Sequence, residues 1–356
     1  MGEVATISLG ESVESAVPDD ALALAAVPAA PADDAAIGPL PASWSGRVAV
    51  ICGPTAVGKS ELVLAGAAAW GAEIVAADSM QVYRALEIGT AKPSAADRAR
   101  VPHWMLDVIE FHEAFTVHDW LHGARQAASE ILARGRRVVV AGGTGLYLKT
   151  FLLGLADMAG GQVAPELKQR IRATTAAAAR AWLCSCDPHA GELVDLANPR
   201  RVERALEQVL ATGRPLAQLR RSWEPAAEWP PGVPVVVLER PADELRRRIE
   251  RRLQAMLAAG WIDEVADLRR RGFGPHLTSG QALGYRDILA HLEGELPAEA
   301  LRDRLAQRTW QFARRQRTWF RHQLPGRWRA AGEDRIPSWE ELVTPDAGRN
   351  RDATTA

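Results

Sequence analysis

Val48-Ala-Val-Ile-Cys-Gly-Pro-Thr-Ala-Val-Gly-Lys-Ser60 is the stretch of the sequence that decides the fold. Its first five residues are apolar and β-prone, and residues 61–70 have the composition of a helix. Between these two segments the chain carries Gly-x-x-x-x-Gly-Lys-Ser, the pattern of a phosphate-binding P-loop. Strand, glycine-rich loop and helix therefore follow one another in the order that a P-loop requires.

A P-loop binds phosphate mainly through its backbone. Gly53 and Gly58 allow the chain to curl so that consecutive N–H groups point at phosphate oxygens. The following helix directs its positive end at the same anion. Lys59 adds a cation, and the Ser60 hydroxyl is a candidate ligand for Mg²⁺. We therefore expect a di- or triphosphate to bind at Gly53, Pro54, Thr55, Ala56, Val57, Gly58, Lys59 and Ser60.

Composition describes a globular protein with an uneven charge distribution. The chain has 356 residues and a net charge of −1, but residues 1–46 hold seven acidic residues and no Lys or Arg. The remainder therefore carries about +6, concentrated in arginine clusters. Three cysteines cannot form a disulfide framework, and no Cys/His spacing predicts zinc. No apolar run reaches the ~18 residues of a membrane helix. We expect a cytoplasmic protein without membrane contact, monomeric by default.

The chain is predicted to contain five segments. Residues 1–46, rich in Ala, Pro and Asp, are expected to be a disordered tail. Residues 47–154 form the first part of an α/β core, and residues 155–232 form a helical insertion. Residues 233–330 complete the core and add basic C-terminal helices, and residues 331–356 are a second disordered tail. The predicted fold is α/β, with a P-loop-type parallel sheet, a helical insertion domain and C-terminal helices.

Two further predicted strands end on polar residues. Residues 73–77 lead into Asp78, and residues 137–141 lead into Gly142-Gly143-Thr144-Gly145. In an α/β fold the carboxyl ends of the strands deliver such side chains to the ligand crevice. Asp78 is therefore a candidate for chemistry; a cap and a Mg²⁺ ligand are the alternatives. Thr144 offers a hydroxyl at the same edge, unless this segment is a plain strand–helix turn.

Three arginines follow a clear helix start in the insertion. Asn198 is a capping residue and Pro199 suits the first helical position. Arg200, Arg201 and Arg204 lie in the first two turns, where cations oppose the helix dipole. An anionic ligand would resolve that conflict, and a solvated basic face is the alternative.

Basic residues also gather after the insertion. Residues 234–239 are predicted to form a strand that returns to the sheet, and residues 245–272 a basic helix. A last long helix, residues 298–323, interleaves Trp and Phe with arginines. This mixture suits phosphate contacts and base stacking, although a solvated charged helix has the same pattern.

From residue 48 to residue 321 the chain resembles the bacterial tRNA dimethylallyltransferases, also called tRNA isopentenyltransferases. The motifs that carry the resemblance are Gly-Pro-Thr-Ala-Val-Gly-Lys-Ser (53–60), Asp-Ser-Met-Gln-Val-Tyr-Arg (78–84), Ile-Gly-Thr-Ala-Lys-Pro (88–93), Gly-Gly-Thr-Gly-Leu-Tyr (142–147), Arg-Arg-Val-Glu-Arg-Ala-Leu-Glu (200–207), Gln-Ala-Leu-Gly-Tyr-Arg (281–286) and Arg-Arg-Gln-Arg-Thr-Trp-Phe-Arg (314–321). The chain departs from the family pattern at Ala85, where glycine is common, and at Asn198-Pro199, which replaces a His-Pro-Asn-Asp segment.

The resemblance implies transfer of the dimethylallyl group of dimethylallyl diphosphate to N6 of the adenosine on the 3′ side of the tRNA anticodon. The P-loop would hold the diphosphate, and Asp78 would be the general base. Lys59, Ser60 with Mg²⁺, and Arg204 would neutralise the departing pyrophosphate. Thr144 would lie near the reacting centre. Residues expected to touch the anticodon stem-loop are Asp78, Ser79, Met80, Gln81, Thr144, Lys168, Arg200, Arg201, Arg204, Gln281 and Arg286.

Three other functions share parts of this pattern. An adenylate isopentenyltransferase has a similar core but uses a free nucleotide, and would not need the insertion or the arginine–aromatic helix. A P-loop kinase would place Asp78 on Mg²⁺ and transfer phosphate. A non-enzymatic RNA-binding protein would not need the intact Lys59 and Asp78.

Overall fold

The computed structural model describes residues 37–155, 165–221, 229–324, 326–330 and 336–343. The chain divides into two compact units. The larger contains the described residues of Gly38–Gly154 and Ala227–Ala356. The smaller contains Ile37 and the described residues of Leu155–Ala226. The two units are described separately below.

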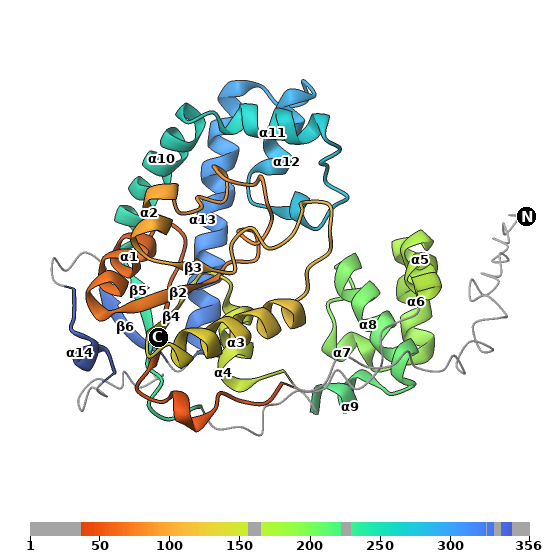
Figure 1. The fold of residues 1–356 in the computed structure, drawn as a ribbon. Helices are drawn as coiled ribbons and strands as arrows, with labels where there is room; N and C mark the ends of the chain where they lie inside the picture. Colours follow the sequence, from red (N-terminus) through yellow and green to blue (C-terminus); the bar gives the residue numbers. More distant parts are fainter. Residues whose placement is uncertain (1–36, 156–164, 222–228, 325, 331–335, 344–356) are drawn as a thin grey trace, which may run out of the picture. The chain divides into compact units, whose positions relative to one another are not determined.

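A six-stranded parallel sheet forms the centre of the larger unit (Figure 1). Its order is β3-β2-β4-β1-β5-β6. The strands are β1 (Val48–Cys52), β2 (Ala72–Ala77), β3 (His103–Trp104), β4 (Arg137–Gly142), β5 (Val235–Glu239) and β6 (Arg327–Ala330). The predicted α/β class and parallel P-loop sheet are confirmed.

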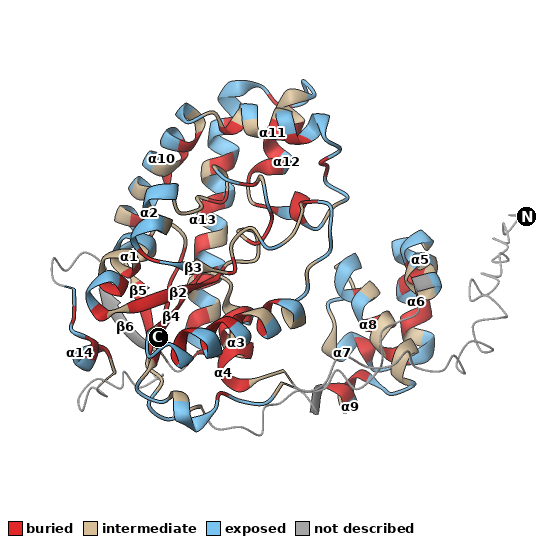
Figure 2. Ribbon diagram, in the orientation of Figure 1, coloured by how far each residue is buried: buried red, intermediate tan, exposed pale blue. Residues whose placement is uncertain are grey.

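Both faces of the sheet are covered. Every residue of β1 and β2 is buried, as expected for parallel strands with near-continuous apolar sequences (Figure 2). Helices α1 (Lys59–Trp70) and α3 (Val117–Ala133) pack against β2 and β4, and α4 (Gly145–Leu153) packs against α3. The indole of Trp120 stacks on Tyr147, with ring centroids 4.4 Å apart.

The register aligns the ends of three neighbouring strands. Cys52 of β1 pairs with Gly142 of β4, and Gly142 pairs with Ala77 of β2. The P-loop, Thr144 and Asp78 therefore leave the sheet at one level. Gly142 is required there because a Cβ atom would collide with the Ala77 carbonyl group. This alignment is what positions the site.

Between β5 and β6 the described chain forms four helices and a 3-10 turn, each of which packs on another of them (Figure 1). They are α10 (Ala242–Ala258), α11 (Trp261–Arg270), η3 (Ser279–Gln281), α12 (Tyr285–Leu292) and α13 (Ala298–Gln323). The single helix predicted over residues 245–272 is wrong, because Gly260 adopts a left-handed conformation with φ of 93° and separates α10 from α11.

Both segments that were expected to be disordered tails contain residues with defined structure. Residues 37–46, assigned to a disordered tail, include a buried Leu40 and the 3-10 turn η2 (Ala42–Trp44). In the C-terminal segment, α14 (Trp339–Val343) docks by a buried Trp339, whose ring meets Trp70 edge-on at 5.8 Å. Both expectations fail because the few apolar residues in these segments are buried by tertiary contacts. The remaining residues of both expected tails lie outside the described ranges, apart from residues 336–338.

The smaller unit is helical and has its own apolar core. It contains α5 (Pro165–Ala173), α6 (Ala176–Cys186), α7 (Ala190–Leu193), α8 (Pro199–Thr212) and α9 (Leu216–Arg221). Trp182 and Leu183 of α6 pack with Leu206 and Val209 of α8 in this core. The Asn198 side chain caps α8 by accepting a bond from the Arg201 amide, and Pro199 is its first residue. One short helix of the larger unit, α2 (Ala95–Arg100), completes the described elements. None of the helices formed by described residues is long and apolar enough to cross a membrane.

Candidate active site

The P-loop connects β1 to α1 in the conformation that its glycines allow. Gly58 has a φ of 106° and Gly53 a φ of 152°. A Cβ atom on Gly53 would approach the Leu238 carbonyl oxygen of β5 to 2.7 Å, so only glycine fits against that strand. Lys59 and Ser60 open helix α1, so its N-terminus faces the space above the loop.

Three side chains from the C-terminal half of the chain brace the P-loop. Gln316 of α13 accepts a bond from the Thr55 amide at 2.8 Å. Arg248 of α10 donates to the Ala56 carbonyl at 2.8 Å. Arg240 donates to the Val57 carbonyl at 2.8 Å. Three consecutive loop residues are thus each held by a different long-range partner, which preorganises the loop backbone for an anion.

Lys59 and Arg252 bring two cations to the same place. Lys59 Nζ donates to the Gly53 and Pro54 carbonyls, both at 2.8 Å. Burial, and then the charge of Arg252, lower the pKa of Lys59 to about 8, against the opposing effect of Asp78. Burial likewise lowers the pKa of Arg252. No hydrogen bond or ion pair to another described residue holds the Arg252 guanidinium. Two desolvated cations side by side favour a polyanionic ligand.

Asp78 and Thr144 stand together at the neighbouring strand ends, as the sequence predicts. Thr144 Oγ1 accepts a bond from the Ser79 amide at 3.0 Å, and the Thr144 amide donates to the Ala77 carbonyl at 3.1 Å. The Asp78 carboxylate accepts one bond, from the Met80 amide at 2.9 Å. That turn fixes one carboxylate oxygen and leaves the other available to accept a proton.

The P-loop, Asp78 and Arg252 line one cavity of about 300 Å³, which we call the inner cavity; Thr144 is not among its lining residues. Lys59, Ser60, Asp78, Arg252 and Gln316 contribute its polar wall. Its apolar wall is formed by Val63, Leu64, Ile74, Ala76, Ala91, Pro93 and Phe312. The cavity therefore combines an anion-binding end with space for a short hydrocarbon group.

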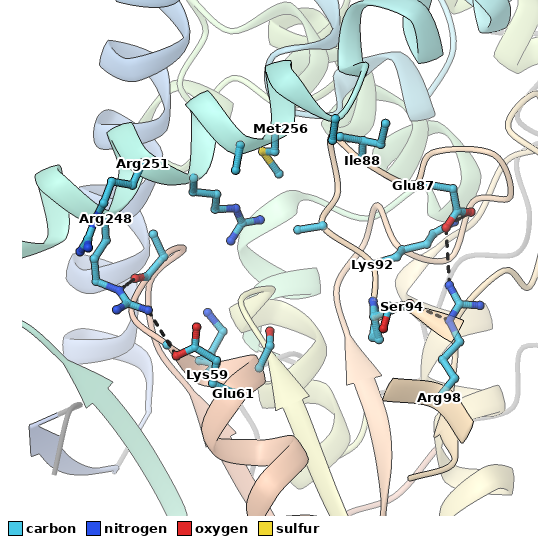
Figure 3. A pocket seen from close by; sticks show the side chains of 18 of the residues that line it. Lys59, Glu61, Glu87, Ile88, Lys92, Ser94, Arg98, Arg248, Arg251 and Met256 are labelled. Carbon is cyan, nitrogen blue, oxygen red and sulfur yellow. Dashed lines mark hydrogen bonds and ion pairs between the residues drawn. The ribbon is translucent and has the colours of Figure 1, made fainter. Parts of the chain in front are cut away.

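A larger, more open cavity of about 1020 Å³, the outer cavity, shares Lys59, Ser60 and Arg252 with the inner one (Figure 3). Figure 3 shows Arg248 and Arg251 of α10 on one side and Lys92 and Arg98 on the other. The outer cavity is thus lined by cations on two opposite walls.

The residues around Ser60 fit a Mg²⁺ ion held jointly with a ligand. The Ser60 side chain is exposed, lines both cavities, and makes no hydrogen bond to another described residue. No group of three or more His, Cys, Asp or Glu side chains forms a metal cage in the described part of the chain. A single hydroxyl suits Mg²⁺, which keeps several waters and binds phosphate oxygens.

Three other predicted site residues either bond to the backbone or lie outside the two cavities. Gln81 lines the inner cavity, but its amide donates to the Thr90 and Ala91 carbonyls. Arg286 of α12 donates to the Pro275 and Gly280 carbonyls in the segment that precedes this helix. Gln281 is exposed, and neither it nor Arg286 lines the two cavities.

Four predicted basic residues belong to the smaller unit. Arg200, Arg201 and Arg204 are exposed on α8, and Lys168 lies on α5. Arg204 pairs with Glu207 at 3.1 Å. The arginine that the structure brings to Lys59 and Asp78 is Arg252, which the sequence analysis left among the basic residues of a helix.

Arg248, Arg252 and Gln316 are the site residues that the sequence analysis missed. One signal could have found the two arginines. They stand four residues apart on the helix that follows β5, and the end of β5 reaches the same sheet edge as the P-loop. No comparable local signal distinguishes Gln316 from the other polar residues of α13.

Comparison with known proteins agrees with this geometry. A model of the IPP transferase family matches residues 81–323. A tRNA dimethylallyltransferase of Opitutus terrae is 44% identical over 283 residues, covering 78% of this chain and 91% of the relative. One of Geobacter sulfurreducens is 39% identical over 284 residues, covering 79% and 91%.

Solved structures of similar proteins share the fold. A tRNA isopentenylpyrophosphate transferase from Bacillus halodurans aligns with a TM-score of 0.59 and 32% identity, over 80% of this chain and 90% of its own. A eukaryotic dimethylallyltransferase acting on tRNA aligns with a TM-score of 0.70 and 25% identity, over 83% and 76%. The sequence, the fold and these likenesses agree: the chain belongs to the IPP transferase family.

Proposed function

We propose that the protein transfers the dimethylallyl group of dimethylallyl diphosphate to N6 of the adenosine on the 3′ side of a tRNA anticodon, releasing pyrophosphate. The observation that carries this proposal is the inner cavity, where a P-loop, a free carboxylate oxygen of Asp78 and an apolar wall meet. Relatives named tRNA dimethylallyltransferase support the same reaction.

The donor would bind with its diphosphate on the P-loop. Loop amides other than that of Thr55, which donates to Gln316, and the N-terminus of α1 would donate to the phosphate oxygens, with Lys59 and Arg252 supplying positive charge. The five-carbon group would lie against Ile74 and Phe312 in the apolar part of the inner cavity. Mg²⁺ held at Ser60 would help neutralise the diphosphate.

The chemical step requires a base on one side and an anion site on the other. The adenine N6 nitrogen would attack the allylic carbon as the carbon–oxygen bond to the diphosphate breaks. The bonding electrons leave with the pyrophosphate, whose new charge Lys59 and Arg252 would stabilise. The Asp78 carboxylate would accept the proton lost by N6. Thr144 would act beside it by fixing the backbone at Ser79.

The acceptor must present an unstacked base. An adenine attacked at its exocyclic amine has to leave the anticodon stack, which costs a few kcal/mol that stacking and phosphate contacts offset. The exposed arginines Arg200, Arg201 and Arg204 suit contacts to the phosphates of an anticodon stem-loop. We propose that the active protein is a monomer.

One assay tests the reaction and its acceptor together. The purified protein receives labelled dimethylallyl diphosphate, Mg²⁺ and either an anticodon stem-loop or free AMP. We expect label in the stem-loop, lost when the target adenosine is replaced by guanosine. Label in AMP alone would instead identify an enzyme that prenylates free nucleotides. ATP consumption without prenyl transfer would identify a kinase.

A further inference from the structure

The segment of residues 87–93, which we call the wall loop, forms part of the lining of both cavities. Ala91, Lys92 and Pro93 line both cavities, and Glu87 and Ile88 line the outer one (Figure 3). The wall loop faces the P-loop across this space, because Gly58, Lys59 and Ser60 line the outer cavity too. Its position therefore sets the width of the cavity.

The carboxylate of Glu264 on α11 anchors the start of the wall loop by accepting hydrogen bonds from three of its backbone amides. Glu264 Oε2 accepts bonds from the Glu87 amide at 3.0 Å and the Ile88 amide at 2.7 Å. Glu264 Oε1 accepts from the Gly89 amide at 3.4 Å and from the Tyr285 hydroxyl at 2.7 Å. One carboxylate thus satisfies four donors, which is close to its full accepting capacity.

The loop is also pressed against aromatic side chains at this point. A Cβ atom on Gly89 would collide with the Trp261 indole and the Tyr285 ring, so the backbone lies directly on both. The rings of Trp261 and Tyr285 meet edge to face, with centroids 5.7 Å apart. Burial, mainly, raises the pKa of Tyr285, which keeps its hydroxyl a donor toward Glu264.

The far end of the wall loop is held independently. Gln81 donates to the Thr90 and Ala91 carbonyls, and Lys92 Nζ donates to the Tyr83 carbonyl at 2.6 Å. Lys92 also pairs with Asp107 and Glu87. The bonds of Gln81, and those of Lys92 to Tyr83 and Asp107, do not involve Glu264, so the loss of Glu264 leaves this second anchor in place.

Glu264 joins this loop to the element that carries the arginines of the site. Gly260 links α11 to α10, which contributes Arg248, Arg251 and Arg252 to the opposite wall of the outer cavity. One side chain thereby ties the wall loop to the helix pair that presents cations to the P-loop. The two walls of the cavity are coupled through it.

We propose that Glu264 is a positioning residue for the diphosphate site, which it shapes by fixing the wall loop relative to the P-loop and α10. This inference rests on the proposed function, in which the donor's diphosphate occupies that space. Glu264 touches neither reactant, and it acts through the backbone of residues 87–89.

The test compares Glu264→Ala with Glu264→Gln, and with Tyr285→Phe as a milder change. A glutamine can direct its carbonyl at the Glu87 and Ile88 amides while its amide group donates to the Tyr285 oxygen, so it restores most of the anchor. Asp263→Ala is the matched control, since Asp263 is the exposed neighbour on the same helix. The readouts are the Kd of inorganic pyrophosphate, the KM of each substrate, and backbone hydrogen exchange of residues 87–89.

We expect Glu264→Ala to raise both the Kd of inorganic pyrophosphate and the KM of dimethylallyl diphosphate by about tenfold. The KM of the stem-loop should stay within about twofold of the wild-type value. Exchange at residues 87–89 should accelerate, and Glu264→Gln should restore all three values toward wild type. Equal losses for both substrates, or faster exchange with unchanged pyrophosphate affinity, would overturn the positioning role. Absence of prenyl transfer by the wild-type protein would count against the proposed function alone, because the exchange and pyrophosphate measurements still decide the role of Glu264.

Discussion

Gln316 Oε1 accepts a hydrogen bond from the Thr55 amide although 261 residues separate the two in the chain. The other end of the same side chain donates to the Gly143 carbonyl at 2.9 Å. One buried amide group therefore joins the loop after β1 to the loop after β4. The first loop is the proposed diphosphate site, and the second leads into Thr144.

We expect Gln316→Ala to raise the KM of dimethylallyl diphosphate by about tenfold, because two bonds that hold the P-loop and the Thr144 loop in register are lost. Steady-state kinetics with each substrate varied in turn measures the effect. Gln311→Ala, an exposed glutamine on the same helix, is the control. A lower melting temperature with an unchanged donor KM would show that Gln316 stabilises the fold without shaping the site.

Asp78→Asn removes the proposed base while keeping the shape of the side chain. The single-turnover rate should fall by roughly 10²–10⁴-fold, the usual contribution of general-base catalysis, with donor and stem-loop affinities unchanged. Rapid-quench measurements with saturating substrates give the rate directly. Asp97→Asn, which alters a second carboxylate of the inner cavity, should remain within about twofold of wild type. A parallel loss of substrate binding in Asp78→Asn would assign Asp78 a structural role.

The lowered pKa of Lys59 predicts the pH dependence of donor capture. In the free enzyme this pKa is about 8, so Lys59 loses its proton as the pH rises through that value. A neutral amine attracts a diphosphate less, and kcat/KM for the donor should therefore decline above pH 8. The pH profile of kcat/KM reports the free enzyme. In Lys59→Arg, whose side chain stays charged, this decline should disappear; its persistence would assign the ionisation to another group.

Ala85 adopts a left-handed conformation with φ of 66°, which is uncommon for a residue other than glycine. An alanine there is strained by about 1–2 kcal/mol, and glycine avoids the strain at the cost of about 0.5–1 kcal/mol of chain entropy. Ala85→Gly should therefore raise the free energy of unfolding by about 0.5–1 kcal/mol in urea titrations. Ala255→Gly in the last turn of α10, where glycine has no strain to relieve, should instead lower it. Destabilisation by Ala85→Gly would contradict this reading of the backbone.

The features that the sequence predicts well, the strands and the start of α8, are determined by residues that are close together in the chain. Apolar runs that end in Gly53, Asp78 and Gly142 predict strands, and parallel strands place their carboxyl ends at one edge. The observed pairing of Cys52, Gly142 and Ala77 is the consequence. The capping of α8 by Asn198 is equally local.

What the sequence does not show is which distant side chains complete the site. Arg248, Gln316 and Glu264 reach backbone groups 192, 261 and 175–177 residues away, and their own neighbours in sequence carry no sign of those contacts. The same reason explains Leu40 and Trp339, which stand in Pro- and Ala-rich or charged surroundings. Only tertiary packing shows that their side chains are buried.

The hydrogen bonds that Arg240, Arg248 and Gln316 make to the P-loop backbone also determine when the site can be completed during translation. Arg240 and Arg248 are added 183 and 192 residues after the loop carbonyls that they bind, and Gln316 follows Thr55 by 261 residues. At about 5–20 residues per second, the ribosome needs roughly 10–50 seconds to reach Gln316. Until Arg240 is added, the nascent chain carries the complete glycine-rich motif but none of these three bonds, and the bond to Gln316 is the last that can form. The proposed diphosphate site is therefore complete only near the end of translation, when Gln316 of α13 can bind a loop that was made at the beginning.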